Sequence, residues 1–300
     1  MKVLITGATG LIGKELTTLL LQNGVNVHYL TTSKRKIENE PNYKGFYWNP
    51  TQGIIDENCI LGVDAIIHLA GASISKRWSN TYKQEIVESR LDSSNLLFKA
   101  LKSNSNQVKQ IISASGTAIY PNSNSIIYTE NSPEISNTFL GNLVIKWEES
   151  IDKFKLLDIT VCKFRTGIVL SNKGGALLEM VRPIKLGFGA AFGNGKQMQS
   201  WIHIHDLAAL YFYAIEHKWE GVFNAVSPSP TSNELITKTI ASVLKKPLFM
   251  PNIPQFVMKL LLGEMHVLLF ENKNISSNKV TDLGFEFKYK SIDQAIENLY

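Results

Sequence analysis

Three glycines near the N-terminus have the spacing of a turn that binds a diphosphate. Gly7, Gly10 and Gly13 lie in the run TGATGLIG, after the apolar segment Val3–Ile5 and before leucines at helical spacing. The first glycine permits a tight turn, the second lets a pyrophosphate approach the backbone, and the third lets the helix pack on the sheet. A glycine-rich turn without a ligand is the alternative. Its place between a first strand and a first helix favours dinucleotide binding, at Gly7, Thr9, Gly10, Leu11, Ile12 and Gly13.

The residues after the second apolar run indicate which dinucleotide is bound. Sheets that bind NAD usually offer an acidic side chain to the ribose 2′-hydroxyl at this point. This sequence instead offers hydroxyls and cations, in the order Thr31, Thr32, Ser33, Lys34, Arg35 and Lys36. Such groups suit the additional phosphate of NADP through charge-assisted hydrogen bonds, whereas a solvated basic loop is the alternative. The segment favours NADP (NADPH) over NAD.

Hydroxyl side chains follow a later apolar strand. Ser113, Ser115 and Tyr120 come at its end, and ligands bind at the carboxyl edge of open α/β sheets. A tyrosine there could protonate a carbonyl group if a cation lowered its pKa. The alternative is a packed ring with a locally satisfied hydroxyl. These three residues are the catalytic candidates.

The elements that must position these residues alternate between strand and helix. The first βαβ unit is complete within about thirty residues, the length that a parallel crossover needs. Buried-type strands are expected at Val25–Leu30, Asp64–Leu69, Lys109–Ala114 and Ile159–Phe164. The pattern predicts an α/β fold, a Rossmann-type doubly wound parallel sheet with a smaller C-terminal substrate lobe. The dinucleotide domain is expected over 1–170, completed by 200–226, and the lobe over 171–199 and 227–300.

Composition excludes several classes of protein. The 300 residues are 44% hydrophobic and 19% charged, which is typical of globular proteins. A net charge of +5, thinly spread, gives no reason to expect nucleic acid. Two distant cysteines without a leader segment favour a reducing cytoplasm, and no apolar run reaches the ~20 residues of a membrane span, so no membrane partner is expected. A small molecule is the expected partner, and a homodimer is possible.

Several strings resemble a known superfamily. TGATGLIG at 6–13, HLAG at 68–71 and FRTGIVL at 164–170 are similar to the extended short-chain dehydrogenases/reductases. GGAL at 174–177, SWIHIHDL at 200–207 and LLLGEM at 260–265 resemble its atypical "epimerase family protein" subgroup of the NAD-dependent epimerase/dehydratases, which carries a small C-terminal domain of unknown function. The resemblance covers essentially the whole chain.

The resemblance implies further contacts with the cofactor. Small residues after the strand that ends at His68 would line the cofactor. Arg90 would lie near the cofactor with Glu85 as a companion, and Ile168 would close over its nicotinamide side. Because Glu85 and Arg90 are five residues apart, they do not share one strict helix face, and a solvated pair is the alternative. The implied contacts are Leu69, Ala70, Gly71, Glu85, Arg90 and Ile168.

The resemblance also bears on two histidines. His203, His205 and Asp206 could be mistaken for a metal site. In the superfamily this segment precedes a helix whose N-cap is the aspartate, so Asp206 is expected to be a cap and no metal is expected.

Active members of the superfamily use a tyrosine as acid or base, with a lysine four residues later that lowers its pKa. No tyrosine of this chain has a lysine at that spacing. The corresponding helix is expected over Phe139–Ile151, with Leu140 and Val144 at the two positions. The atypical subgroup shares this loss.

Two functions remain open at this stage. One is an NADP(H)-dependent oxidoreductase or epimerase acting on a small carbonyl or nucleotide-sugar-type substrate. The other is a cofactor-binding regulator that senses NADPH without turnover. In the lobe, 251–272 is expected to form one amphipathic helix packed on its neighbours, with partner binding or dimerisation as the alternative.

Overall fold

The β-branched N-terminal residues form β1 (Lys2–Thr6), which lies inside a sheet of nine strands in this computed structural model of residues 1–300. The strand order is β13-β9-β7-β6-β1-β2-β4-β3, with β5 paired to β4. All pairs from β13 to β4 are parallel, whereas β3 and β5 run antiparallel to β4. The sheet strands are β2 (Asn26–Thr31), β3 (Asn39–Glu40), β4 (Tyr43–Asn49), β5 (Ile54–Ile55), β6 (Ala65–His68), β7 (Gln110–Gly116), β9 (Thr160–Thr166) and β13 (Gly221–Ala225).

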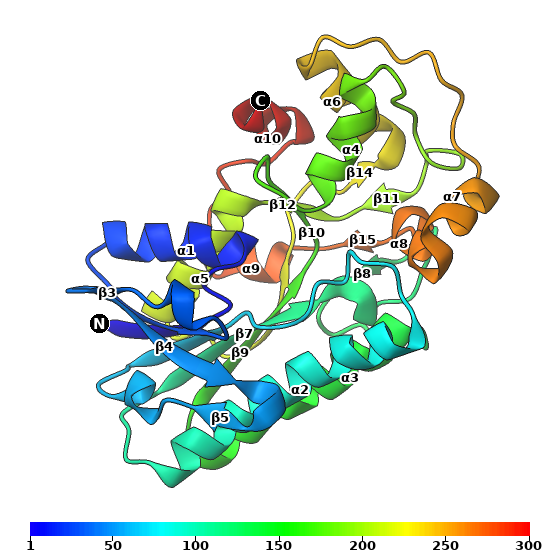
Figure 1. Ribbon diagram of the computed structural model, residues 1–300. Coiled ribbons are helices and arrows are strands. Elements are labelled where there is room, and N and C mark those ends of the chain that lie inside the picture. Colours follow the sequence, from blue (N-terminus) through cyan, green and yellow to red (C-terminus); the bar gives the residue numbers. More distant parts are fainter.

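Helices cover both faces of this sheet, as the predicted doubly wound fold requires (Figure 1). One face carries α1 (Leu11–Gln22) and α5 (Ile204–Glu216), and the other carries α2 (Asn80–Ser103) and α3 (Phe139–Asp152). Parallel strands buried on both faces explain why their sequences are continuously apolar. The α/β Rossmann-type prediction is confirmed.

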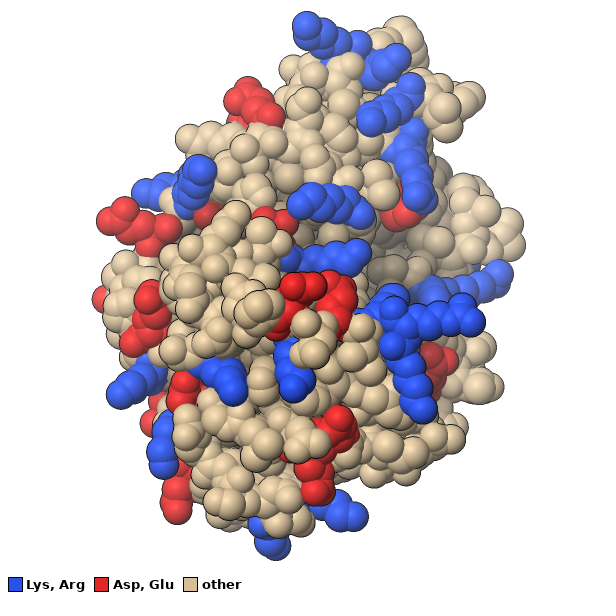
Figure 2. Space-filling view, turned by 60° about the vertical axis from the view of Figure 1, so that its left-hand side comes forward, with Lys and Arg blue, Asp and Glu red and all other residues tan.

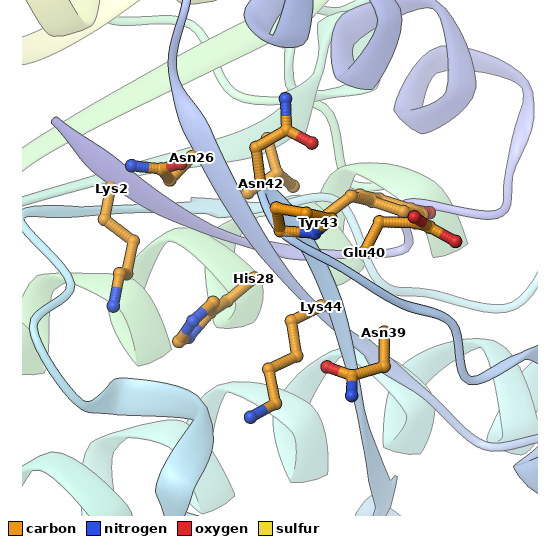
Figure 3. Close-up of a pocket in the computed structure, with 10 residues that line it drawn as sticks. Lys2, Asn26, His28, Asn39, Glu40, Asn42, Tyr43 and Lys44 are labelled. Atoms are coloured by element: carbon orange, nitrogen blue, oxygen red, sulfur yellow. The ribbon is translucent and has the colours of Figure 1, made fainter.

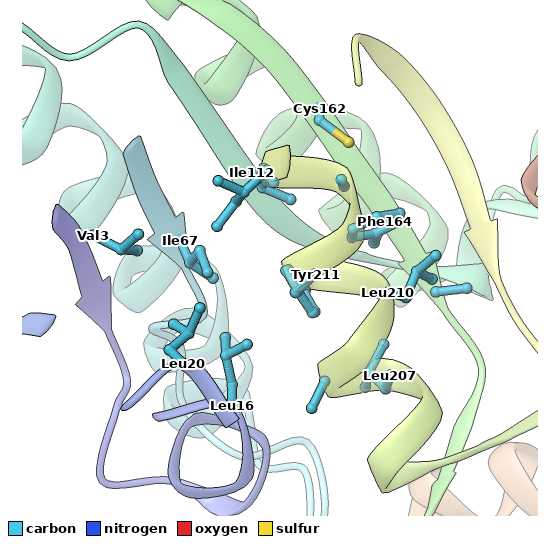
Figure 4. Packing of buried hydrophobic residues seen from close by; sticks show 14 of the residues in the cluster. Val3, Leu16, Leu20, Ile67, Ile112, Cys162, Phe164, Leu207, Leu210 and Tyr211 are labelled. Carbon is cyan, nitrogen blue, oxygen red and sulfur yellow. The ribbon is translucent and has the colours of Figure 1, made fainter. Parts of the chain in front are cut away.

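The larger core cluster lies between the sheet, α1 and α5. Figure 4 shows Tyr211 of α5 among the residues of this cluster, and its ring centroid lies 4.9 Å from that of Phe164 on β9. The same cluster includes residues from near the C-terminus, among them Phe285. The chain therefore returns to the main sheet after it has left the lobe.

The lobe is built from short elements around a separate apolar cluster. Trp201, Ile236 and Ile296 meet there and are buried. Its elements, together with the small sheets beside it, are α4 (Ala176–Lys185), α6 (Asn233–Val243), α7 (Gln255–Leu262), α8 (Val267–Phe270), α10 (Ile292–Leu299), β8 (Ile127–Tyr128), β10 (Ile168–Leu170), β11 (Met198–Gln199), β12 (Trp201–His203), β14 (Thr231–Ser232) and β15 (Asn274–Ile275). Helix α9 (Asn278–Asp282) lies instead against the main sheet, where its Val280 belongs to the larger core cluster.

The single helix expected over 251–272 is wrong. The segment forms α7, a 3-10 turn over Gly263–His266, and α8. Gly263 has φ +61°, a left-handed conformation that interrupts a right-handed helix. None of the helices is both long and apolar enough to cross a bilayer.

Candidate functional site

Gly7 and Gly13, at the turn between β1 and α1, have no room for a side chain. Gly7 has φ +75°, and a Cβ at this residue would lie 3.0 Å from the backbone of Leu69. A Cβ at Gly13 would lie 2.2 Å from the carbonyl oxygen of Gly7, so only glycine lets α1 begin this close to the turn. Gly10 is the N-cap of α1 and is exposed, and no side chain caps the helix. The free N–H groups of the first turn can therefore bind an anion.

A buried hydrogen-bond network joins this turn to the end of β6. The Thr6 hydroxyl oxygen accepts bonds from the backbone N–H groups of Leu69 and Ala70, both at 3.1 Å. Its proton is then free for Nδ1 of His68, 2.8 Å away. Nε2 of His68 faces the Ser94 hydroxyl at 3.2 Å, and that hydroxyl donates to the Arg90 carbonyl. The network defines one tautomer, in which Nε2 carries the proton.

This network holds Leu69 and Ala70 against the glycine turn at the point where the strand order reverses, between β1 and β6. Ligands of open α/β sheets bind at this position. Neither His68 nor Thr6 was predicted to have a role, although both lie in the strings that resemble the superfamily. A histidine that ends an otherwise apolar strand was the available signal.

Arg90 of α2 lies beside the same loop. A Cβ at Gly71 would be 3.0 Å from the Arg90 guanidinium carbon. The guanidinium donates to the Ile86 carbonyl at 2.9 Å and lies 4.9 Å from the Trp147 ring centroid, and its Nε is buried without a partner. No carboxylate pairs with it, and burial lowers the pKa of Arg90 to about 10. A buried cation without a counter-ion is costly, and a bound phosphate would compensate it.

Glu85 does not accompany Arg90. It is exposed on α2, whereas Arg90 is buried, and no hydrogen bond or ion pair joins the two side chains. A contact between Glu85 and the cofactor remains a prediction.

The predicted NADP segment lies at the carboxyl end of β2. Thr31 is buried and its hydroxyl accepts from the N–H of Ser33 at 3.2 Å, which shapes the turn. Thr32 is exposed. Lys34 and Arg35 lie in a 3-10 turn, are exposed, and have no carboxylate partner, although Lys34 lies 5.1 Å from the Tyr47 ring centroid. The cations are therefore free to meet an anion.

The start of α1 is also covered from the side of the lobe. The side chain of Leu11 lies 3.6 Å and 3.2 Å from Cβ atoms built at Gly174 and Gly175. Ile168 begins β10, pairs with Trp201 of β12 and is partly buried. Ile12 and Thr9 are also partly exposed in the turn. Segments from both parts of the chain thus border the glycine turn.

The three catalytic candidates are enclosed. Ser113 is fully buried, and its hydroxyl donates to the carbonyl of Ala114 at 2.9 Å. Ser115 donates to Glu148 of α3 at 2.6 Å, and that carboxylate also accepts from Arg165.

Tyr120 adopts the packed alternative left open by the sequence. The residue is 1% exposed, its ring stacks on Tyr128, and its hydroxyl donates to Asn224 at 2.7 Å. It also accepts from Arg165 at 3.0 Å, yet burial raises the pKa of Tyr120. Asn224 and Arg165 thus hold the hydroxyl of a buried ring, and Tyr120 is not an exposed acid.

Sequence reasoning missed the ion pair behind these hydroxyls. Arg165 of β9 donates to Glu148 through Nε at 2.9 Å and through Nη2 at 3.0 Å. Charges within an apolar strand and on the buried face of the facing helix were the available signal. The pair explains why Ser115 and Tyr120 have fixed positions.

Helix α3 is apolar at the two positions where active members of the superfamily carry the tyrosine and the lysine. Leu140 and Val144 are 7% and 3% exposed. Leu140 belongs to a cluster with Trp78, against which Met265, Val267 and Leu268 of the lobe are packed. Val144 lies against Gly116, whose Cβ position is 3.4 Å away. No group on this part of the helix can exchange a proton.

Asp206 is not the N-cap of α5. The cap is His203, whose Nδ1 accepts from the N–H of His205 at 3.1 Å. Asp206 lies in the first turn and accepts from the backbone N–H groups of Lys288 and Tyr289, both at 3.0 Å. The predicted cap is therefore wrong, because the carboxylate instead fixes the returning C-terminal segment. No group of three or more His, Cys, Asp or Glu is arranged to hold a metal.

Two hollows lie away from the glycine turn. One, of about 560 Å³, is at the amino ends of β1, β2 and β4, where Lys2, His28 and Lys44 point to one side (Figure 3). Because it lies at the opposite ends of the strands, it is separate from the dinucleotide site. The other, of about 260 Å³, lies between the loop after β7 and the lobe and is rich in amides: Asn122, Asn124, Asn194, Gln197, Gln255 and Asn272 line it with Phe270.

Comparisons with known proteins agree with this arrangement. The model of the NAD dependent epimerase/dehydratase family matches residues 3–141, and that of a domain of unknown function (DUF1731) matches residues 253–299. An epimerase family protein of Staphylococcus aureus (strain MRSA252) is 34% identical over 297 residues, which cover 99% of this chain and 98% of that protein.

Two solved structures are similar over the whole chain. The crystal structure of human epimerase family protein SDR39U1 (isoform 2) with NADPH has a TM-score of 0.86 and 29% identity, and the match covers 100% of this chain and 99% of that one. The nucleoside-diphosphate sugar epimerase of Corynebacterium glutamicum has a TM-score of 0.80 and 28% identity, covering 100% of this chain and 58% of that one. Because the Staphylococcus aureus protein is 34% identical to this chain over nearly the full length of both, this chain belongs to the epimerase family proteins of the extended short-chain dehydrogenase/reductase superfamily.

Proposed function

We propose that this protein binds NADPH as its functional ligand and reports the cofactor's presence, without the tyrosine–lysine proton transfer of the wider superfamily. One observation carries this proposal. The face of α3 that would hold the acid and its lysine partner presents Leu140 and Val144, and residues of the lobe pack over Leu140. Proton transfer at this place needs a polar group within hydrogen-bond reach.

The residues of the site fit a phosphorylated dinucleotide. The glycine turn would hold the diphosphate, and the unpaired Nε of Arg90 offers a donor beside Gly71. Lys34 and Arg35 would meet the 2′-phosphate, because no carboxylate occupies them. The crystallised human relative was solved with NADPH. When bound, the cofactor supplies a hydride donor.

The experiment that tests the cofactor is a comparison of NADPH and NADH binding by titration calorimetry. In the K34A/R35A variant, loss of two charge-assisted contacts should weaken NADPH binding at least tenfold and leave NADH binding nearly unchanged. The K99A/K102A variant, with two exposed cations removed from the far end of α2, is the control. An unchanged preference for NADPH in K34A/R35A contradicts the NADP proposal.

A second candidate is an NADP(H)-dependent oxidoreductase or epimerase acting on a small carbonyl or nucleotide-sugar-type substrate. The amide-rich hollow favours it, because amide groups both donate and accept hydrogen bonds, as a polyhydroxylated substrate requires. The proton that such a reaction transfers would have to come from water or from a group bound by the amide side chains.

Turnover separates the two candidates. The wild-type protein is incubated with NADPH or NADP⁺ and a panel of aldehydes, ketones and nucleotide sugars. Absorbance at the nicotinamide band reports net hydride transfer, and proton NMR of the compounds reports epimerisation, which changes neither their mass nor the cofactor. A substrate-dependent change with the wild-type protein, absent without it, would establish the second candidate and overturn the regulatory one. A protein that binds NADPH and leaves every compound unchanged supports the first.

A reducing compartment suits both candidates. Cys59 and Cys162 are buried and unpaired, and burial raises the pKa of the Cys59 thiol to about 12. Both thiols are thereby unreactive, and we propose the cytoplasm as the site of action.

A further inference from the structure

Helix α7 has an unusual surface for a helix of a folded protein. Its sequence QFVMKLLL is apolar except for Gln255 and Lys259, yet none of its residues is buried. Phe256 is 73% exposed and Leu260 is 79% exposed, and they are four residues apart on one face. Leu261 beside them is also exposed. A helix with this composition normally packs its apolar side into a core.

The same edge of the lobe exposes more large apolar side chains. The segment before α7 runs parallel to the segment after α4, since Ile253 exchanges backbone hydrogen bonds with Ala191 and Gly193. Gly189 and Leu248 are also in close contact. The two segments carry exposed side chains, and with those of α7 they define the apolar edge: Leu186, Phe188, Phe249, Met250, Phe256, Leu260 and Leu261.

The apolar edge is distinctive within this molecule. It holds every phenylalanine among the exposed large hydrophobic residues, and Phe249 is 80% exposed. In Figure 1 the segment between α6 and α7 runs along the outer margin of the lobe, far from the central sheet. Large apolar side chains exposed together on neighbouring segments are typical of an interaction site.

Lysines that pair with no carboxylate accompany these side chains, although Lys185 lies 5.1 Å from the ring centroid of Tyr300. Lys185 precedes Leu186, Lys245 and Lys246 precede Phe249, and Lys259 lies between Phe256 and Leu260. All four are exposed, and none forms an ion pair with a carboxylate. The acidic side chains of α4 and α6, Glu179 and Glu234, are already paired with Arg182 and Lys238. Figure 2 shows Lys and Arg side chains gathered over the upper end of the molecule, at the height of α4 and α6 in Figure 1.

We propose that the apolar edge and its four lysines dock the protein on the surface of an anionic lipid bilayer. Aromatic and aliphatic side chains would enter the headgroup region, while the lysines would meet lipid phosphates. The most exposed side chains project from a loop and from one face of a short helix. Cations beside projecting apolar side chains give the charge complementarity that a surface of anionic lipids requires.

This proposal departs from the expectation of no membrane partner, which rested on the lack of a spanning segment. Surface docking needs no span, because it depends on apolar side chains that enter the interface and on cations next to them. It is also independent of the proposed cofactor role, since the dinucleotide turn and the apolar edge share no residue.

Vesicle sedimentation of the full-length protein tests the proposal. We expect the wild type to sediment with vesicles of equal parts phosphatidylcholine and phosphatidylglycerol, far less with phosphatidylcholine alone, and less at high salt. Each lysine near an anionic surface contributes about a fivefold factor in binding, so K245E/K246E should lower it at least 25-fold. F249S/M250S should lower it about tenfold or more, since both side chains are exposed and their loss leaves the core intact.

Matched variants elsewhere provide the controls. Leu156 is 79% exposed, as is Leu260, but lies after α3, so L156S should sediment as the wild type does, and K99E/K102E should as well. Equal sedimentation of the edge variants and the wild type, or no sedimentation of the wild type, overturns the proposal. If light scattering shows a wild-type dimer that F249S/M250S converts to a monomer, with vesicle binding unchanged, the edge is an interface between copies and the proposal fails.

Discussion

Arg90 shows how a single residue can indicate a ligand. Its guanidinium lies beside Gly71, is buried, and retains an unpartnered Nε. Stability alone would select against this arrangement, because the Ile86 carbonyl and the Trp147 ring compensate only part of the hydration that a buried cation loses, and no counter-charge is present. The cost is explained if an anion such as the diphosphate of the cofactor completes the site.

Replacement of Arg90 should therefore separate binding from stability. In Arg90→Met, loss of a charge-assisted hydrogen bond worth about 1.5–3 kcal/mol should weaken NADPH binding ten- to a hundredfold. The melting temperature of the unliganded protein should stay equal or rise, because methionine fills the space without a buried charge. Calorimetry and thermal unfolding measure the two effects, with Lys99→Met on the same helix as the control. A lower melting temperature with unchanged NADPH affinity would assign Arg90 a purely structural role.

At the scale of elements, the structural features that could be predicted from sequence are those that depend on residues close together in the chain. The glycine turn and the first βαβ unit depend on local spacing and were predicted from it. The role of Asp206 was not, because its carboxylate accepts from the backbone of Lys288, 82 residues away in sequence. The exposure of α7 was not either, because an apolar sequence predicts a packed helix whether or not this molecule covers it. The enclosure of Tyr120 by Asn224 likewise depends on two strands that are distant in sequence.

Within the glycine turn, Gly13 is the residue least open to change. A Cβ there would lie 2.6 Å from Cα of Ala8, and backbone atoms cannot give way without moving α1. Gly13→Ala should lower the free energy of unfolding by about 3 kcal/mol or more and weaken NADPH binding. Gly24→Ala is the matched control, since it has φ +72° but nothing within 4 Å, and should lose only about 1 kcal/mol through backbone strain. Urea unfolding compares them, and equal losses would show that close packing at Gly13 is unimportant.

At the scale of the whole molecule, buried neutral histidines connect the cofactor site to global stability. Burial lowers the pKa of His68 to about 3 and that of His203 to about 3. His68 joins β1, β6 and α2 through Thr6 and Ser94, and His203 begins α5 at the end of β12. Protonation of His68 at Nδ1 would remove the acceptor of the Thr6 hydroxyl and loosen the Leu69 loop.

These histidines predict a loss of stability in acid with a defined sign. Because the folded-state pKa of His68 is below its unfolded value of 6.5, the unfolded chain binds a proton that the folded chain does not between pH 6.5 and about 3. The stabilisation is complete above pH 6.5 and is lost as the pH falls, by about 2 kcal/mol between pH 7 and pH 5 for one such group. His68→Gln can accept from Thr6 and donate to Ser94 without titrating, so its free energy of unfolding should fall about 2 kcal/mol less than that of the wild type over this range. Urea unfolding at both pH values measures the difference, and parallel losses in the two proteins would mean that His68 is protonated in the folded state.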